Sequence, residues 1–209
     1  MIFSQIKKLV DRLPLLVIAS MQFVLLPPAC FATDYDKIVV PAEPPPVRGN
    51  YAPDAVGLGW IAFENGNHKQ ALTFFKWQIQ YHPDEPHAYF GVAYVYSIEG
   101  RLDEAIRFYR ESLQRDSKHA DTYANLGYAL LRQRQSTEGL QMLDQAIKLT
   151  PGCGAAYLSY SLYYGNQEKW KEAGEYANEA IDRGVKIPSA YVKRLRKHKV
   201  RVNEPTSLQ

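Results

Sequence analysis

The sequence contains only two cysteines among 209 residues, Cys30 and Cys153. So few thiols exclude a scaffold held together by several disulfides and a zinc site built from cysteines. The formal net charge is only +3, which gives no general electrostatic reason to expect a nucleic-acid partner. The mostly apolar stretch 13–26 is shorter than the roughly 20 residues that a membrane-spanning helix needs.

Sequence motifs for catalysis and cofactor binding are also missing. The five histidines show no metal-binding spacing on one helix face, and there is no phosphate-binding loop or nucleophile elbow. Residues 57–62, GLGWIA, match the dinucleotide-binding fingerprint only formally, because no strand precedes them. The acidic pairs 84–85 and 103–104 are adjacent in sequence, so their side chains point in different directions and make poor acid–base pairs. We therefore expect no enzyme activity, no cofactor and no metal site.

The N-terminal residues have the order of a secretory signal peptide. A basic opening with Lys7, Lys8 and Arg12 is followed by the apolar stretch and by small residues from Ala29 to Ala32. This order predicts a signal peptide over 1–32 and an exported protein of the periplasm or cell envelope. Two alternatives stay open, an uncleaved membrane anchor and a lipoprotein acylated at Cys30. Residues 33–51 are rich in proline and predict an extended linker.

Most of the remaining chain repeats with a period of 34 residues, which is the mark of a repeat array. The stretch 120–151 reads as two amphipathic helices joined by a short polar turn, and its neighbours are variations of it. The expected helices span 53–65, 69–82, 86–99, 103–116, 120–133, 137–150, 154–165, 169–183 and 189–200.

Aligned at this period, two columns contain only small residues, and two contain mainly large apolar ones. The small columns allow two helices to cross closely, and the large ones fill the layer between helices. A fifth column is tyrosine in every unit but the first. The two small columns are Gly59, Ala93, Gly127 and Ser161, and Ala71, Ala105, Gly139 and Ala173. The two large apolar columns are Leu58, Val92, Leu126 and Tyr160, and Ile79, Leu113, Ile147 and Ile181. The tyrosine column is Ala55, Tyr89, Tyr123, Tyr157 and Tyr191.

These units resemble tetratricopeptide repeats. The resemblance is carried in the first unit by Leu58–Gly59, Ala71, Phe75 and Pro83, and in the third by Tyr123, Leu126–Gly127, Ala146 and Pro151. It implies an all-α protein, a right-handed superhelical solenoid of four helix–turn–helix units over 52–85, 86–119, 120–153 and 154–187. A capping helix over 188–200 and a polar tail over 201–209 would complete the chain. The function it implies is a protein-binding scaffold.

In this family the first helices of the units line a concave groove, where a partner peptide or helix would bind. Projected onto this chain, the groove residues are Val56, Trp60, Phe63, Phe90, Tyr94, Ala124, Tyr128, Leu131, Arg132, Leu158 and Leu162. The predicted groove is aromatic and nearly uncharged. Val56 and Trp60 stand where family members that clamp a terminal carboxylate have lysine and asparagine, so we do not expect a carboxylate clamp.

Other interpretations of these aromatic residues remain open. They could form part of the core, or the groove could be filled by the chain's own residues 33–50 or by another protomer, as in a self-associating assembly subunit. Cys153 lies in the turn between the third and fourth units, where it is either a reactive or disulfide-forming thiol or a half-buried turn residue.

The charges separate along the chain. Residues 33–192 carry 16 Lys and Arg against 20 Asp and Glu, whereas residues from 193 onward carry 6 against 1. The basic residues of the last helix are Lys193, Arg194, Arg196, Lys197 and Lys199. They predict either a solvated solenoid cap or a contact for an anionic membrane or an acidic protein. Nucleic acid is not the expected partner, because the protein is expected to be exported.

Overall fold

The computed structural model describes residues 41–44 and 55–203. The predicted signal peptide, most of the linker and residues 204–209 of the predicted tail lie outside the described residues. The described part contains nine helices: α2 (Val56–Glu64), α3 (His68–Tyr81), α4 (Pro86–Ile98), α5 (Leu102–Arg115), α6 (Ala120–Arg132), α7 (Ser136–Leu149), α8 (Gly154–Asn166), α9 (Trp170–Asp182) and α10 (Ser189–Lys197). Each helix end lies within three residues of the end expected from the sequence.

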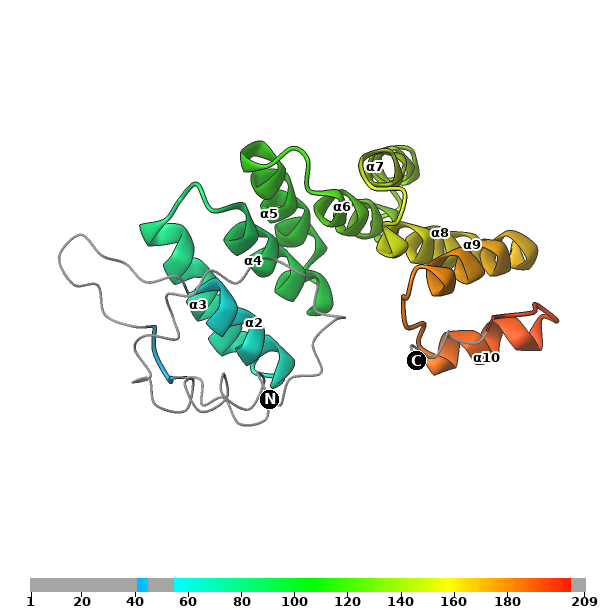
Figure 1. Ribbon diagram of the computed structural model, residues 1–209, viewed down its shortest axis with the longest axis horizontal. Helices are drawn as coiled ribbons and strands as arrows, with labels where there is room; N and C mark the ends of the chain where they lie inside the picture. The colour runs from blue at the N-terminus through cyan, green and yellow to red at the C-terminus, as the bar shows by residue number, and fades with distance from the viewer. Residues whose placement is uncertain (1–40, 45–54, 204–209) are drawn as a thin grey trace, which may run out of the picture.

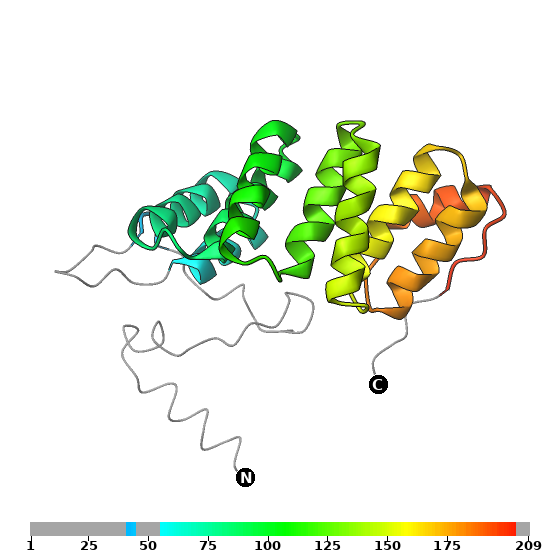
Figure 2. The same ribbon diagram turned by 90° about the horizontal axis from the view of Figure 1, so that it is seen from above.

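The helices form successive pairs, each packed against the next, in a right-handed superhelical solenoid (Figures 1 and 2). The pairs are α2–α3, α4–α5, α6–α7 and α8–α9, and α10 follows them as a final helix. The first helices of neighbouring units also contact one another, α2 with α4, α4 with α6, and α6 with α8. The predicted fold class of four helix pairs and a capping helix is confirmed.

A residue in the left-handed backbone region closes the first helix of every unit. These residues are Gly66, Gly100, Arg134 and Glu168, with φ between 61° and 78°, and they recur every 34 residues. In each turn the next residue donates its backbone N–H to a carbonyl five positions earlier, as Asn67 does to Ala62 over 2.9 Å. Glycine adopts this conformation without a steric penalty, whereas Arg134 and Glu168 adopt it at a cost.

The small residues of the predicted columns lie where helices come close together. The ring of Phe75 from α3 fits between Gly59 of α2 and Gly91 of α4, and a Cβ added to either glycine would lie within 2.6 Å of that ring. In the third unit, Gly127 and Gly139 face each other so closely that a Cβ on Gly127 would lie 2.8 Å from the carbonyl oxygen of Gly139. This close backbone approach explains why the third unit has glycine at position 139, where the other three units have alanine.

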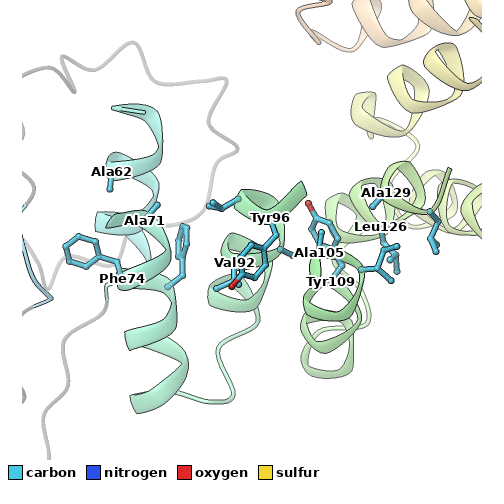
Figure 3. Packing of buried hydrophobic residues seen from close by; sticks show 14 of the residues in the cluster. Ala62, Ala71, Phe74, Val92, Tyr96, Ala105, Tyr109, Leu126 and Ala129 are labelled. Carbon is cyan, nitrogen blue, oxygen red and sulfur yellow. The ribbon is translucent and has the colours of Figure 1, made fainter. Parts of the chain in front are cut away.

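The hydrophobic core runs along the solenoid in consecutive clusters. The first joins buried residues of α2 to α6, among them Phe74, Val92, Tyr109 and Leu126 (Figure 3). A second joins α6, α7 and α8, and a third joins α9, α10 and the residues after α10. Because each cluster spans neighbouring helices, burial of apolar surface couples each unit to the next.

The C-terminus departs from the sequence-based expectation. Helix α10 ends at Lys197, and residues 200–203 return along α9 as a strap. Val202 is buried, and Asn203 donates its backbone N–H to the side chain of Asn178 over 2.7 Å. The prediction of a polar tail from residue 201 is therefore wrong for 201–203. Val200 and Val202 find an apolar surface on α9, where the absence of a side chain at Gly174 leaves room for Val200.

The tyrosine column and the C-terminal helix meet at Tyr191. Its hydroxyl donates to the carbonyl oxygen of Ser161 over 2.7 Å and lies 3.0 Å from the Ser161 hydroxyl. Ser161 in turn donates to the carbonyl oxygen of Ala173 over 2.6 Å. A buried network of this kind connects α8, α9 and α10 and leaves its polar atoms satisfied.

Candidate functional site

Four aromatic side chains from two neighbouring first helices contact one another on one face of the solenoid. Trp60 and Phe63 come from α2, and Phe90 and Tyr94 come from α4. The Trp60 ring centroid lies 5.8 Å from that of Phe90 and 5.6 Å from that of Tyr94. Phe63 and Tyr94 meet edge to face at 5.3 Å. All four side chains are half-buried, and we call this set the aromatic face.

Histidines extend the aromatic face at both ends. His68 stacks on Phe63 with centroids 5.0 Å apart, and His119 meets Phe90 at 5.4 Å. Burial lowers the pKa of His119, and the neighbouring His87 lowers it further. The imidazole of His119 therefore stays neutral at neutral pH. Burial raises the pKa of Tyr94. The groups that border these rings are therefore mostly uncharged.

The aromatic face is anchored in the core. Trp60 packs edge to face on the buried Phe75 at 5.2 Å, and Trp60, Phe63 and Phe90 all pack against the first core cluster. Each ring thus has one part in the core and another part open to solvent. Rings held in this way lose little conformational freedom when a partner covers them.

The other predicted groove residues have different surroundings. Ala124 is fully buried and cannot line an open surface, because its methyl group belongs to the core cluster of α6 to α8. Tyr128 lies beneath the guanidinium group of Arg132 at 5.7 Å. Arg132 itself donates to the carbonyl oxygen of Ser97 over 3.1 Å and so links α6 to α4.

The remaining members of the predicted groove pack against apolar neighbours. Val56 lies against the first cluster, Leu131 packs on Gly139, and Leu158 and Leu162 contribute to the C-terminal cluster. The structure therefore brings together the aromatic residues of the first two units. It places the predicted residues of the last two units mainly in helix-to-helix contacts.

Two shallow depressions lie on other surfaces of the solenoid. One is lined by polar side chains of α5 and the turn before α7, including Arg107, Arg110 and Gln133. The other is lined by Tyr157, Tyr164, Glu172, Glu175, Tyr176 and Glu179 of α8 and α9. Our sequence reasoning did not find the second depression. The density of tyrosine between 157 and 176, and glutamates spaced three and four residues apart on one helix, were the available signals.

All five predicted basic residues of the last helix, from Lys193 to Lys199, are exposed. Arg194 is engaged within the chain, since it donates to the carbonyl oxygen of Gly165 over 3.2 Å and lies over the Trp170 ring at 4.8 Å. His198 stacks on the same Trp170 ring at 3.8 Å. Four of these basic residues thus stand on a helix that is attached to the last unit, and Lys199 lies two residues beyond its end.

Cys153 is a buried free thiol, 5% exposed. Its Sγ lies 3.6 Å from a carboxylate oxygen of Asp121. Burial raises the pKa of the Cys153 thiol to about 11, so the thiolate is scarce at neutral pH. These surroundings agree with the interpretation of Cys153 as a packed turn residue.

Within residues 41–44 and 55–203, no cluster of three or more His, Cys, Asp or Glu side chains is arranged to hold a metal ion. Over the same residues, every helix is too short or too polar to cross a membrane.

Comparison with known proteins identifies the family. Two family models, both described as tetratricopeptide repeat, match residues 56–120 and 98–160, which together make up about half of the chain. The chain belongs to the tetratricopeptide-repeat family. Proteins of this family are in general non-enzymatic scaffolds that bind protein partners.

Individual relatives are distant. The chain is 29% identical over 68 residues to a peroxisomal targeting signal receptor of Yarrowia lipolytica, a match that covers 32% of this chain and 11% of the receptor. It is 23% identical over 132 residues to the TPR repeat-containing protein YpiA of Bacillus subtilis, covering 63% of this chain and 31% of YpiA. The chain thus spans less than one third of either relative.

The fold is similar to that of solved structures. One is that of Pseudomonas aeruginosa pilF, with a TM-score of 0.57 and 25% identity over 69% of this chain and 68% of that chain.

Proposed function

We propose that this protein is an exported scaffold of the periplasm or cell envelope that holds an apolar peptide or amphipathic helix of a partner protein on its aromatic face. The contact of Trp60 and Tyr94, from successive first helices, carries this proposal. These two residues are half-buried with part of each ring open to solvent, rigidly supported, and surrounded by groups with little charge.

The chemistry of the face favours an apolar anchor. Tryptophan and tyrosine are enriched among the residues that dominate binding energy at interfaces, because they bury much area at a small entropic cost. A partner with apolar residues at helical spacing, or at alternate positions of an extended strand, could place them against these rings. A partner that depends on a carboxylate anchor is not favoured, since Val56 and Trp60 offer no positive charge.

A relative supports binding of a short segment by such repeats. The matched protein of Yarrowia lipolytica is named as a receptor for a targeting signal. The likeness covers 11% of that receptor, so only the mode of recognition is transferred in this proposal. The proposed export rests on residues 1–32, where basic, apolar and small residues follow in the order of a signal peptide.

Site-specific photocrosslinking tests the binding surface. A photoreactive phenylalanine analogue at position 94 should crosslink one defined protein in the producing cells. The same analogue at Tyr81, which is 40% exposed on α3 outside the aromatic face, serves as the matched control. A crosslink of equal yield from both positions, or none from position 94, would contradict the proposal.

The second candidate is an assembly subunit whose face is filled by its own N-terminal segment or by another protomer, and one contact within the chain favours the self-filled form. The side chain of Gln70 donates to the carbonyl oxygen of Pro41 over 2.7 Å, which places part of the linker beside α3, two residues from His68 of the extended face. Peptide mapping of the crosslink from position 94 separates the candidates. A crosslink to residues 33–50 of the same chain would identify a self-filled face, and one between two copies would identify an assembly subunit.

The mass of the mature protein tests the proposed localisation. We expect the intact protein from its host to begin at Thr33 and to appear in the periplasmic or secreted fraction. A protein that begins at Cys30 and carries acyl chains would instead be a membrane-tethered scaffold. A chain that retains Met1 in the cytoplasmic fraction would contradict export.

A further inference from the structure

The depression between α8 and α9, separate from the aromatic face, combines tyrosine rings with carboxylates. It is lined by Tyr157 and Tyr164 of α8 and by Glu172, Glu175, Tyr176 and Glu179 of α9. The three glutamates follow at intervals of three and four residues, so they lie along one side of the helix. We call this set the tyrosine–glutamate depression.

Three helices hold the rings in place. Tyr176 stacks on Tyr164 with centroids 5.4 Å apart and on Tyr160 at 4.9 Å. The Tyr160 hydroxyl donates to a carboxylate oxygen of Asp144, on α7, over 2.5 Å. The depression is therefore a rigid surface.

The ring faces at the edges of the depression already attract cations of the same chain. The guanidinium carbon of Arg183 lies 4.0 Å from the centroid of Tyr157, and the ammonium group of Lys169 lies 5.7 Å from that of Tyr164. The electron-rich face of an aromatic ring favours such contacts. These two contacts show the kind of group that this surface accepts.

Three carboxylates and no basic side chain line the depression, although two of the carboxylates already have a cation of the same chain beside them. Arg183 pairs with Glu179, and Lys171 lies 4.0 Å from Glu175 with both side chains largely exposed. Burial and then the hydrogen bond to Asp144 raise the pKa of Tyr160, and burial followed by Tyr164, Asp144 and Glu175 raises the pKa of Tyr176. A cationic side chain would add an ion pair to the ring contact.

The same chain carries a segment with the complementary chemistry. Lys193, Arg196 and Lys197 of α10 are exposed and stand three and four residues apart, so they share one side of the helix. Residues 33–192 carry a net charge of −4, from 16 basic and 20 acidic residues, whereas α10 carries four basic residues and no acidic one.

Within one molecule, α10 and its strap contact α9 on a different side. The strap packs on Gly174 and bonds to Asn178, whereas the depression uses Glu172, Tyr176 and Glu179. At 100° per residue, Glu172, Tyr176 and Glu179 lie on the side of α9 opposite to Gly174 and Asn178, and Glu175 lies between the two sides. A contact between the basic side of α10 and the tyrosine–glutamate depression therefore joins different molecules. It leaves one free depression and one free α10 at the two ends of the assembly.

We propose that the tyrosine–glutamate depression binds the basic side of α10 from a second copy of this chain, so that the protein associates head to tail. The contact is made of exposed charges and ring faces, and its strength falls with salt. This association goes beyond the binding of a partner on the aromatic face, and it leaves that face free.

Sedimentation velocity of the intact protein tests the association. At low ionic strength the average mass should rise with concentration and pass beyond that of a dimer, since a head-to-tail contact does not close. In about 0.5 M salt, where charges are screened beyond a few ångströms, the protein should sediment as a monomer. A monomer of constant mass at low salt and high concentration would overturn the proposal.

A pair of variants identifies the two surfaces. One carries Glu172→Gln and Glu175→Gln, and the other carries Lys193→Gln, Arg196→Gln and Lys197→Gln. Each alone should remain monomeric with unchanged helicity. An equimolar mixture should form a one-to-one complex and grow no further, because only one intact depression and one intact α10 are present in each pair.

Further variants exclude other surfaces. Lys118→Gln with Lys148→Gln removes exposed positive charge elsewhere and should leave association unchanged. Tyr94→Ala should also leave it unchanged, which separates this contact from one on the aromatic face. Association that survives in the α10 variant but not in the depression variant would overturn α10 as the occupant and indicate another segment of the same chain.

Discussion

The guanidinium group of Arg115 lies over the ring of Tyr89, with its central carbon 3.6 Å from the ring centroid, and one of its nitrogens donates to the Tyr89 hydroxyl over 2.7 Å. Arg115 also donates to the carbonyl oxygen of Pro83 over 2.6 Å, and it thereby connects the end of α5 to the loop between α3 and α4. The arrangement recurs 68 residues later, where Arg183 lies over Tyr157 and bonds to Pro151.

Replacing Arg115 should therefore reduce the free energy of unfolding by more than removal of an exposed charge would reduce it. We expect Arg115→Ala to lower the free energy of unfolding by about 1–2 kcal/mol, from the lost hydrogen bonds and the lost cation–π contact. Arg115→Lys should recover little, because an ammonium group cannot make the forked contacts. Urea denaturation measures both variants. Lys118→Ala, an exposed control, should change stability by less than about 0.5 kcal/mol.

Two glycines at the same position of successive units should respond in opposite ways to alanine. Nothing lies within 4 Å of a Cβ added to Gly57, whereas a Cβ on Gly91 would lie 2.6 Å from the Phe75 ring. Gly57→Ala should raise stability by about 0.5–1 kcal/mol, because alanine favours the helix. Gly91→Ala should lower it by about 1–3 kcal/mol through overpacking. Equal effects of the two substitutions on thermal unfolding would contradict the close packing of Phe75.

The left-handed turn residues offer a route to higher stability. Glu168 has φ of 61°, whereas Gly100, at the corresponding position of the second unit, has φ of 78°. Glu168→Gly should stabilise the protein by up to about 1 kcal/mol. Glycine removes a backbone strain of about 1–2 kcal/mol, and the greater conformational entropy of glycine in the unfolded chain offsets part of that gain. Gly100→Ala should destabilise it. Calorimetric melting temperatures check the pair, and a lower melting temperature for Glu168→Gly would refute the argument.

The Cys153 thiol should react slowly in the native protein. Because its pKa is raised to about 11, the reactive thiolate is a minor species at pH 8, and burial limits access further. In a Cys30→Ser background, alkylation by iodoacetamide should be much slower in the folded protein than in urea. Fast labelling of native protein at pH 7 would indicate an exposed thiol instead.

The same pKa predicts how stability depends on pH. The folded pKa of Cys153 is raised above its ordinary value of 9.0, so its contribution is fully present below pH 9 and is lost as pH rises toward 11. A Cys153→Ala variant should lose less stability than the parent between pH 9 and pH 11. Urea denaturation across this range provides the measurement.

Sequence reasoning located the aromatic residues but not all of their contacts. Trp60, Tyr94 and Tyr128 share one column, yet only the first two meet ring to ring, at 5.6 Å. In the third unit Ala124 takes the place of Phe90, and the Arg132 side chain reaches Tyr128. A repeated position therefore predicts the side of a helix, whereas the neighbours from other units decide what the side chain contacts.

The C-terminal strap and the tyrosine–glutamate depression lay beyond such reasoning. Residues 200–203 have no repeat counterpart, and their place on α9 depends on Gly174 and Asn178, some 25 residues earlier. The depression requires Tyr157 and Tyr176 to meet across two helices, with ring centroids 6.5 Å apart. Neither arrangement follows from the pattern of one helix.

The sequence by itself determined the helices, their order and their pairing. These depend on local properties, namely apolar residues at helical spacing, glycine or polar turns, and small residues at the 34-residue period. The tertiary structure decided which aromatic rings stay half-exposed, where Arg115 and Arg183 close their units, and which sides of α9 and α10 remain open. Those outcomes depend on distances between side chains from different units, which packing sets only after the helices have come together.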